Sequence, residues 1–140
     1  MGVRRRGREL ALQMLYQHEL AGTDVERIFS SFDELEEAPP GAREFAVALV
    51  RGVLARRDEI DERLGGQADN WRLDRMAAVD RNILRLALYE LLFEGDTPPA
   101  VVIDEAVEIA KRFGSERSSQ FVNGVLDGVL HRQATRGSGG

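Results

Sequence analysis

The most apolar stretch of the chain is Met76–Phe93, with the sequence MAAVDRNILRLALYELLF. On a helix of 3.6 residues per turn its apolar side chains fall on every side, with Ile83 nearly opposite Leu88. A helix that is apolar all round is a buried helix. A membrane span needs about 20 apolar residues without charges, and charged residues such as Asp80 and Arg85 interrupt this stretch. The pattern therefore predicts the central helix of an all-α domain.

Helical periodicity continues on both sides of this stretch, and Gly, Pro or capping residues separate the segments. The predicted flanking helices cover residues 5–21, 25–35, 42–64, 98–113 and 115–130. We expect Thr23 and Glu26 to form a capping box before the second helix. We expect Asp74 to cap the central helix and Thr97 the helix after it, with Pro98 in its first position. Trp71 is predicted to plug the edge of the core.

Composition narrows the class of protein. The chain has 140 residues, is 43% hydrophobic, and contains no cysteine and two histidines. This is enough for one domain with its own core, which we expect over residues 1–133, followed by a disordered tail over 134–140. Thiol chemistry is excluded, and we expect no metal and no cofactor. The N-terminus lacks the apolar segment of a secretion signal, so the expected location is cytoplasmic.

The net charge of −5 conceals a segregation of charge along the chain. Residues 1–22 carry a formal charge of +2, residues 23–110 of −10, and residues 111–140 of +3. Contacts with a polyanion are therefore expected at the two ends, and the acidic middle suits a basic partner. The other interpretation is a solvated surface of mixed charge.

One flank of the first predicted helix carries Arg5, Arg6, Gln13 and Tyr16 within about 100° of each other. Arginines, an amide and an exposed aromatic ring are the groups that bind phosphates and unstacked bases. Glu9 shares this flank and weakens its positive field. The alternative is that Tyr16 lies at the core edge and the arginines form a solvated helix start.

Two other segments carry candidate groups. Arg81 and Arg85 form a basic stripe on the central helix, explained either by nucleic-acid contacts or by ion pairs with neighbouring helices. The acids of residues 55–64 alternate with arginines, which indicates an exposed charged face and not paired catalytic carboxylates.

The last predicted helix carries Phe121 at the edge of its apolar stripe, beside Arg117 and the two interior glycines Gly124 and Gly128. Each interior glycine costs a helix about 1 kcal/mol relative to alanine. The bare surface serves either close helix packing or a nucleotide lying flat beside the ring, flanked by Gln120 and Asn123.

Four segments, RRRGRELALQMLYQ, DRNILRLALYEL, PAVVIDEAVEIAKRFG and SSQFVNGVLD, resemble the NusB family of bacterial transcription antitermination factors in order and spacing. The resemblance implies an all-α fold of about seven helices, in two perpendicular bundles that share a long central helix. It also implies binding to the boxA element of the nascent rRNA leader, together with NusE, a small-subunit ribosomal protein. The expected assembly is the Nus complex on RNA polymerase, with NusA and NusG.

Carried over residue by residue, the resemblance assigns the arginine-rich start to Arg4, Arg5, Arg6 and Arg8, and the aromatic residue to Tyr16. It assigns the FVNG motif to residues 121–124. Gly7 stands where such proteins often have alanine, which we expect to loosen the first turn. Some members form homodimers, and both a monomer and a homodimer fit this sequence.

The sequence thus predicts two surfaces and no enzyme. The predicted RNA-binding residues are Arg4, Arg5, Arg6, Arg8, Gln13, Tyr16, Arg81, Arg117, Gln120, Phe121 and Asn123. The predicted partner-binding residues are Asp80, Asp104, Glu105 and Glu108. The alternatives are a helical protein–protein adaptor without direct RNA readout, and an rRNA cytosine methyltransferase. The second lacks support, because the sequence contains neither a catalytic cysteine nor a methyl-donor domain.

Overall fold

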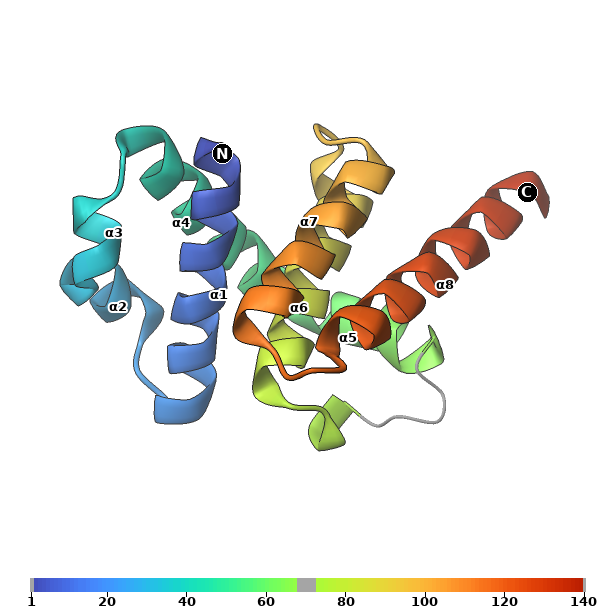
Figure 1. Cartoon of the computed structure of the whole chain (residues 1–140), viewed down its shortest axis with the longest axis horizontal. Helices are drawn as coiled ribbons and strands as arrows, with labels where there is room; N and C mark the ends of the chain where they lie inside the picture. Colours follow the sequence, from blue (N-terminus) through green and yellow to red (C-terminus); the bar gives the residue numbers. More distant parts are fainter. Residues whose placement is uncertain (1, 68–72, 140) are drawn as a thin grey trace. The chain divides into compact units, whose positions relative to one another are not determined.

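A computed structural model describes residues 2–67 and 73–139, with residues 66, 67 and 133–139 described by their backbone alone. The regular structure of these residues consists of eight α-helices, one 3-10 helix and one π-helical segment (Figure 1). The predicted all-α class is therefore confirmed. The chain divides into two compact units, residues 1–55 and 56–140, each with a core of its own.

The first unit is built on α1 (Val3–Ala21) packed along α4 (Pro40–Ala55), with the short helices α2 (Val25–Ser31) and α3 (Asp33–Glu37) between them in sequence. Arg43 of α4 donates from Nε to the carbonyl of Leu35, at 3.1 Å, and so caps the end of α3. The largest fully buried side chains of this unit are Leu10, Leu12, Met14, Ile28, Leu49 and Val50.

The connection through α2 and α3 differs from the prediction in two ways. Phe32, with φ −85° and ψ 105°, separates two helices where one was predicted over 25–35. The predicted capping box is wrong, because Asp24 is the N-cap of α2 and no side-chain hydrogen bond caps that end. Glu26 instead pairs with Arg51 of α4. The carbonyl of Thr23 accepts a hydrogen bond from Nδ1 of His18, at 2.7 Å.

The second unit surrounds α6 (Ala78–Tyr89), which contacts α5 (Arg57–Gln67), α7 (Pro99–Phe113) and α8 (Ser118–Gly139). The 3-10 helix η1 (Leu73–Arg75) precedes α6, and the π-helical segment η2 (Glu90–Glu94) continues it. Ile83, Leu84 and Leu88 are at most 2% exposed. The prediction of a buried central helix is therefore confirmed.

Several predicted boundaries in the rest of the chain are wrong. Residues 42–64 belong to two helices, because the chain turns at Arg56. The N-cap of α6 is Ala77 and not Asp74, and the N-cap of α7 is Pro98 and not Thr97. The last helix begins at Ser118, three residues after the predicted start. Trp71 lies outside the described residues. The domain boundary at residue 133 and the disordered tail stay predictions.

None of the described helices combines the length and the apolar character that crossing a membrane requires.

Candidate nucleic-acid interface

Two arginines at the start of α1 lie against the ring of Phe45, on α4 of the same unit. The guanidinium carbons of Arg4 and Arg8 are 4.9 and 5.3 Å from the ring centroid, within the range of cation–π attraction. Arg4 is exposed to solvent, whereas Arg8 is only 5% exposed. The burial of Arg8 argues against a phosphate contact by this side chain.

Gly7 lies between these two arginines, where α1 approaches α4 closely. A Cβ atom at this position would lie 2.8 Å from Cδ2 of Phe45 and 3.1 Å from the carbonyl oxygen of Ala42. Alanine would therefore force the ring to move. The glycine that we expected to loosen the first turn has a packing function, since it makes room for the ring that holds Arg4 and Arg8.

The remaining α1 candidates form a mixed surface. Arg5, Arg6 and Gln13 are half-buried, and Tyr16 is 39% exposed. The carboxylate of Glu9 lies 3.6 Å from Arg6, which reduces the positive field as predicted. Tyr16 offers part of its ring to solvent, as a base-stacking residue requires.

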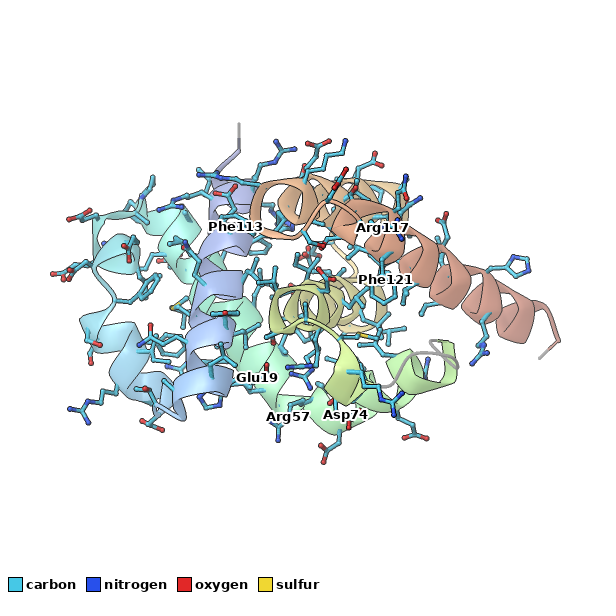
Figure 2. All side chains as sticks on the ribbon, turned by 60° about the horizontal axis from the view of Figure 1, so that its bottom comes forward. Glu19, Arg57, Asp74, Phe113, Arg117 and Phe121 are labelled. Carbon is cyan, nitrogen blue, oxygen red and sulfur yellow. The ribbon has the colours of Figure 1, made fainter. Side chains whose placement is uncertain are left out.

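In the second unit, the start of α8 and the segment before α6 line an open pocket of about 470 Å³. Pockets that bind small molecules or single groups span roughly 300–1,000 Å³. Three predicted RNA-binding residues, Arg117, Gln120 and Phe121, line this pocket. Figure 2 labels Arg117 and Phe121 at the start of α8. The full set of lining residues is Arg75, Met76, Ala77, Asp80, Ser115, Arg117, Ser118, Gln120 and Phe121.

A tight turn between α7 and α8 determines where α8 begins. The backbone N–H of Ser115 donates to Oγ of Ser118, at 2.8 Å, and the two hydroxyl groups are 3.1 Å apart. A Cβ atom on Gly114 would lie 2.5 Å from Cβ of Ser118, so glycine is needed for this close approach. Sequence reasoning missed this serine pair, although a Gly-Ser-x-x-Ser pattern at a helix start is a recognisable signal.

Asp80 contributes an acceptor to the pocket. It lies in the first turn of α6 and is half-buried. Its Oδ1 atom is buried and accepts no hydrogen bond from any described residue. A buried acceptor without a donor costs about 1–3 kcal/mol or more. Because the Asp80 residue also lines the pocket, its carboxylate suits a ligand that brings an N–H or O–H group. Asp80, predicted to bind a protein partner, thus lies with the RNA-binding candidates.

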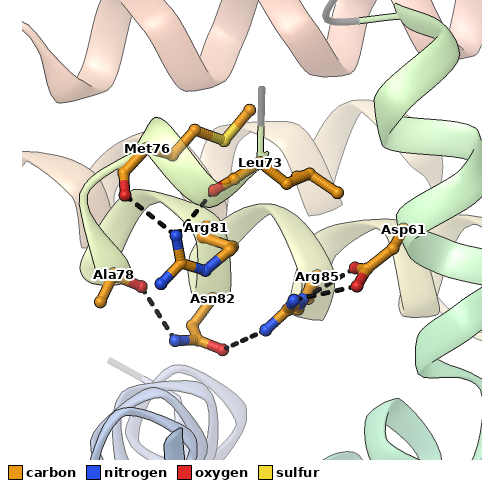
Figure 3. A network of polar contacts seen from close by, with 7 residues as sticks. All are labelled: Asp61, Leu73, Met76, Ala78, Arg81, Asn82 and Arg85. Atoms are coloured by element: carbon orange, nitrogen blue, oxygen red, sulfur yellow. Dashed lines mark hydrogen bonds and ion pairs between the residues drawn. The ribbon is translucent and has the colours of Figure 1, made fainter. Parts of the chain in front are cut away.

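The two arginines of the predicted basic stripe on α6 form hydrogen bonds with residues of the second unit (Figure 3). Nη1 of Arg81 donates to the carbonyl oxygens of Leu73, at 2.7 Å, and Met76, at 3.0 Å. Arg85 donates from Nε and Nη2 to the two carboxylate oxygens of Asp61, at 2.8 and 2.9 Å. The ion-pair alternative is therefore confirmed for Arg85, and Arg81 binds backbone carbonyls.

The next turn of α8 carries Asn123 and Gly124, both exposed. A Cβ atom on Gly124 would meet nothing within 4 Å among the described residues. Close helix packing among the described residues therefore does not account for Gly124. That a nucleotide lies against the bare helix stays a prediction.

The predicted partner-binding acids of α7 form a stripe. Asp104 and Glu108 are exposed and Glu105 is half-buried. Nζ of Lys111 lies 3.4 Å from Glu108 in an exposed pair, which contributes little stability. Val101, one turn before Glu105 on the same helix, is 43% exposed. An apolar side chain beside acids is suited to a basic protein surface.

An exposed tyrosine with arginines, and a pocket with an aromatic ring, an amide and an unsatisfied acceptor, are groups that bind single-stranded RNA. An all-α fold that carries such groups is typical of the nucleic-acid-binding class of proteins.

The chain belongs to the NusB family, whose model matches residues 5–131. Transcription antitermination protein NusB of Geobacter sulfurreducens is 49% identical over 140 residues, covering 98% of this chain and 100% of that protein. A solved structure of T. maritima NusB has 45% sequence identity and a TM-score of 0.82, covering 90% of this chain and 89% of that one. The chain is thus a transcription antitermination factor and not an enzyme.

A further solved structure shows antitermination factors NusB and NusE in complex with dsRNA. One of its chains has 30% sequence identity and a TM-score of 0.85 to this protein, covering 94% of this chain and 98% of that one. The NusB-like fold expected from the sequence is therefore confirmed.

Proposed function

We propose that this protein binds the boxA element of the nascent rRNA leader together with NusE. The two would act within the Nus complex on RNA polymerase, with NusA and NusG, in support of rRNA transcription in the cytoplasm. Membership of the NusB family supports this proposal, as does the similarity to a chain solved with NusE and RNA.

The observation that carries the RNA part is the pocket at the start of α8. Phe121 offers a ring on which a base stacks, and the carboxylate of Asp80, which lines the same pocket, accepts a hydrogen bond from the edge of that base. Arg117, exposed at the pocket, binds a phosphate. Gln120 and Asn123 add hydrogen bonds along α8. In the first unit, Arg4, Arg5 and Arg6 hold phosphates and Tyr16 stacks on a second base.

The partner surface of the proposal is the acidic stripe of α7, formed by Asp104, Glu105 and Glu108. A ribosomal protein that also binds rRNA carries basic surface, which complements this stripe. Binding of RNA and NusE is expected to be cooperative, because NusE brings positive charge to a protein whose own net charge is −5.

The central experiment measures binding of a boxA RNA and a scrambled RNA by fluorescence anisotropy. Phe121→Ala removes a stacking platform and should weaken boxA binding roughly 5- to 150-fold, with little change in melting temperature. Phe93→Ala is the matched control, since Phe93 is also half-buried but lies in η2, after the end of α6 that is remote from Asp80. It should leave RNA affinity unchanged.

The opposite result has a clear signature. A buried phenylalanine costs about 3–5 kcal/mol when truncated to alanine. If Phe121→Ala melts much earlier while the folded fraction binds boxA normally, the pocket has a structural role only. Equal affinity for boxA and scrambled RNA, combined with tight NusE binding, would favour the helical adaptor without RNA readout. Light scattering of the same samples distinguishes a monomer from a homodimer.

A further inference from the structure

One wall of the pocket consists of a backbone segment with little regular structure of its own. The pocket is lined here by Arg75, the last residue of the three-residue helix η1, and by Met76 and Ala77, which connect η1 to α6. No side-chain hydrogen bond caps α6 at Ala77. Met76, 8% exposed, is the one buried residue of the segment 73–77. The shape of the wall therefore depends on what holds its carbonyl groups.

Arg81 holds two of these carbonyl groups at once. Its Nη1 atom donates to Leu73 O, eight residues before it, and to Met76 O, five residues before it, at 2.7 and 3.0 Å (Figure 3). The two hydrogens of one guanidinium nitrogen diverge in a fixed plane, so this atom can bind both oxygens without further adjustment. The backbone N–H of Met76 also donates to the carbonyl of Leu73, at 3.2 Å. The Arg81 side chain reinforces this hydrogen bond and so helps to fix the separation between the start of η1 and the residue that follows it.

The two hydrogen bonds from Arg81 to Leu73 and Met76 form a clamp, and the part of α6 that carries Arg81 is itself held in place. Asn82 donates from Nδ2 to the carbonyl of Ala78, at 2.9 Å, within the first turn of α6. Arg85, one turn further on, is bound by both carboxylate oxygens of Asp61 on α5 (Figure 3). Because these contacts already hold the first turns of α6, the two hydrogen bonds of Arg81 constrain the 73–77 segment and not the helix that carries Arg81.

We propose that Arg81 is a positioning residue for the RNA pocket. It holds the 73–77 wall in the shape that receives a base against Phe121, and it does not itself contact RNA. This inference rests on the proposed function, and it replaces the direct RNA contact expected for Arg81 from the sequence.

The test compares Arg81→Met and Arg81→Lys with the unaltered protein, well below their melting temperatures. Freed from the clamp, the wall must be ordered when RNA binds, which should weaken boxA affinity roughly 2- to 12-fold. Amide hydrogen exchange at residues 73–77 should be faster. The slope of log affinity against log salt should not change, because the substitutions remove no ion pair with a phosphate. Lysine keeps the charge but not the planar fork, so it should not restore affinity.

Three outcomes would overturn the positioning role. A slope flattened by about 0.7 in Arg81→Met, with affinity and slope restored in Arg81→Lys, would show a phosphate contact. Unchanged exchange at 73–77 would show that the clamp does not hold the wall. Faster exchange or a lower melting temperature with normal RNA affinity would show a structural role without effect on the pocket.

Phe121→Ala separates this inference from the proposed function. If Phe121→Ala weakens boxA binding and the Arg81 variants do not, the positioning role fails while the proposed RNA site stands. If neither Phe121→Ala nor the Arg81 variants change RNA affinity, the proposed site itself fails, and the positioning role fails with it.

Discussion

Arg85 of α6 and Asp61 of α5 are joined by two hydrogen bonds, of 2.8 and 2.9 Å, in the paired geometry that guanidinium and carboxylate groups favour. The two side chains are 12% and 26% exposed. Solvent therefore screens this pair less than it screens exposed pairs such as Arg56 and Glu59, whose side chains are 53% and 47% exposed.

The first prediction is that Asp61→Ala lowers the free energy of unfolding by about 1.5–3 kcal/mol, the range for hydrogen bonds to charged groups. Glu62→Ala is the control, because Glu62 is exposed on the same helix and lies outside its first turn, and it should change stability by about 0.5 kcal/mol at most. Chemical denaturation of both variants measures the difference. Equal stabilities would show that the pair contributes nothing.

The second prediction concerns the start of α1. Arg5→Ala combined with Arg6→Ala should flatten the slope of log RNA affinity against log salt by about 0.7 for each phosphate that is no longer bound. Arg8→Ala is the matched control, since this buried arginine lies over Phe45. It should lower the melting temperature and leave the slope unchanged. A slope that responds to Arg8 and ignores Arg5 and Arg6 would contradict our assignment.

The third prediction concerns the acidic stripe of α7. Asp104→Lys with Glu108→Lys should slow association with NusE about tenfold or more at low salt, because complementary charge accelerates encounter. Glu34→Lys with Glu37→Lys makes the same charge change at exposed positions of α3 and should have a smaller effect. Stopped-flow association rates compare the two. Equal slowing in both variants would indicate general charge attraction and not an α7 interface.

The fourth prediction concerns Gly124. Alanine there meets open space and should stabilise the protein by about 0.5–1 kcal/mol, since glycine is the poorer helix former. If the bare surface receives RNA, the same variant should bind boxA more weakly in spite of its higher stability. Gly114→Ala should destabilise, because its Cβ atom would clash with Ser118. A stabilised Gly124→Ala protein with full RNA affinity would exclude a nucleotide at this position.

The fifth prediction concerns pH. Burial raises the pKa of Tyr89, Glu94 raises it further, and Arg56 acts in the opposite direction. The neutral phenol is therefore favoured by folding, and the stability that this contributes is lost as pH rises through the raised pKa of the folded state. Ultraviolet titration of Tyr16→Phe, which leaves Tyr89 as the only tyrosine, should give a midpoint above about 10. Arg56→Ala should move that midpoint upward; a downward movement would contradict the assigned cause.

The apolar pattern predicted which side chains are buried better than it predicted where helices end. Ile28 and Leu35 are both buried although Phe32 separates their helices, and Val53 and Ile60 are both buried although the chain turns at Arg56. Positions seven residues apart share a face of one helix. If a helix ends between two such positions and both side chains remain buried, the apolar pattern of the sequence is the same as for one continuous helix. Periodicity alone cannot reveal such breaks.

The sequence predicted which residue types form the candidate site, but it did not predict which of these residues lie together. Arg117, Gln120 and Phe121 line one pocket as neighbours on a predicted helix. Asp80 was grouped with the acids of α7 on charge alone, because its place near α8 depends on tertiary packing. The acceptors of Arg81 are backbone carbonyls five and eight residues away. Because every residue has a backbone carbonyl, the sequence does not indicate which ones an arginine will bind.

The turn from Gly114 to Ser118 also sets the rotation of α8 about its own axis. Each residue of an α-helix advances by about 100°, and Phe121 follows the anchored Ser118 by three residues. Suppose that one residue is inserted between Ser115 and Ser118 and that the helix still begins at the same point in space. Every later residue then moves one position along the helix, so the ring of Phe121 turns away from Asp80, although every pocket residue is still present in the sequence. The length of this turn therefore determines whether Phe121 lines the pocket. A relative that has the FVNG motif after a longer turn is expected to lack this pocket.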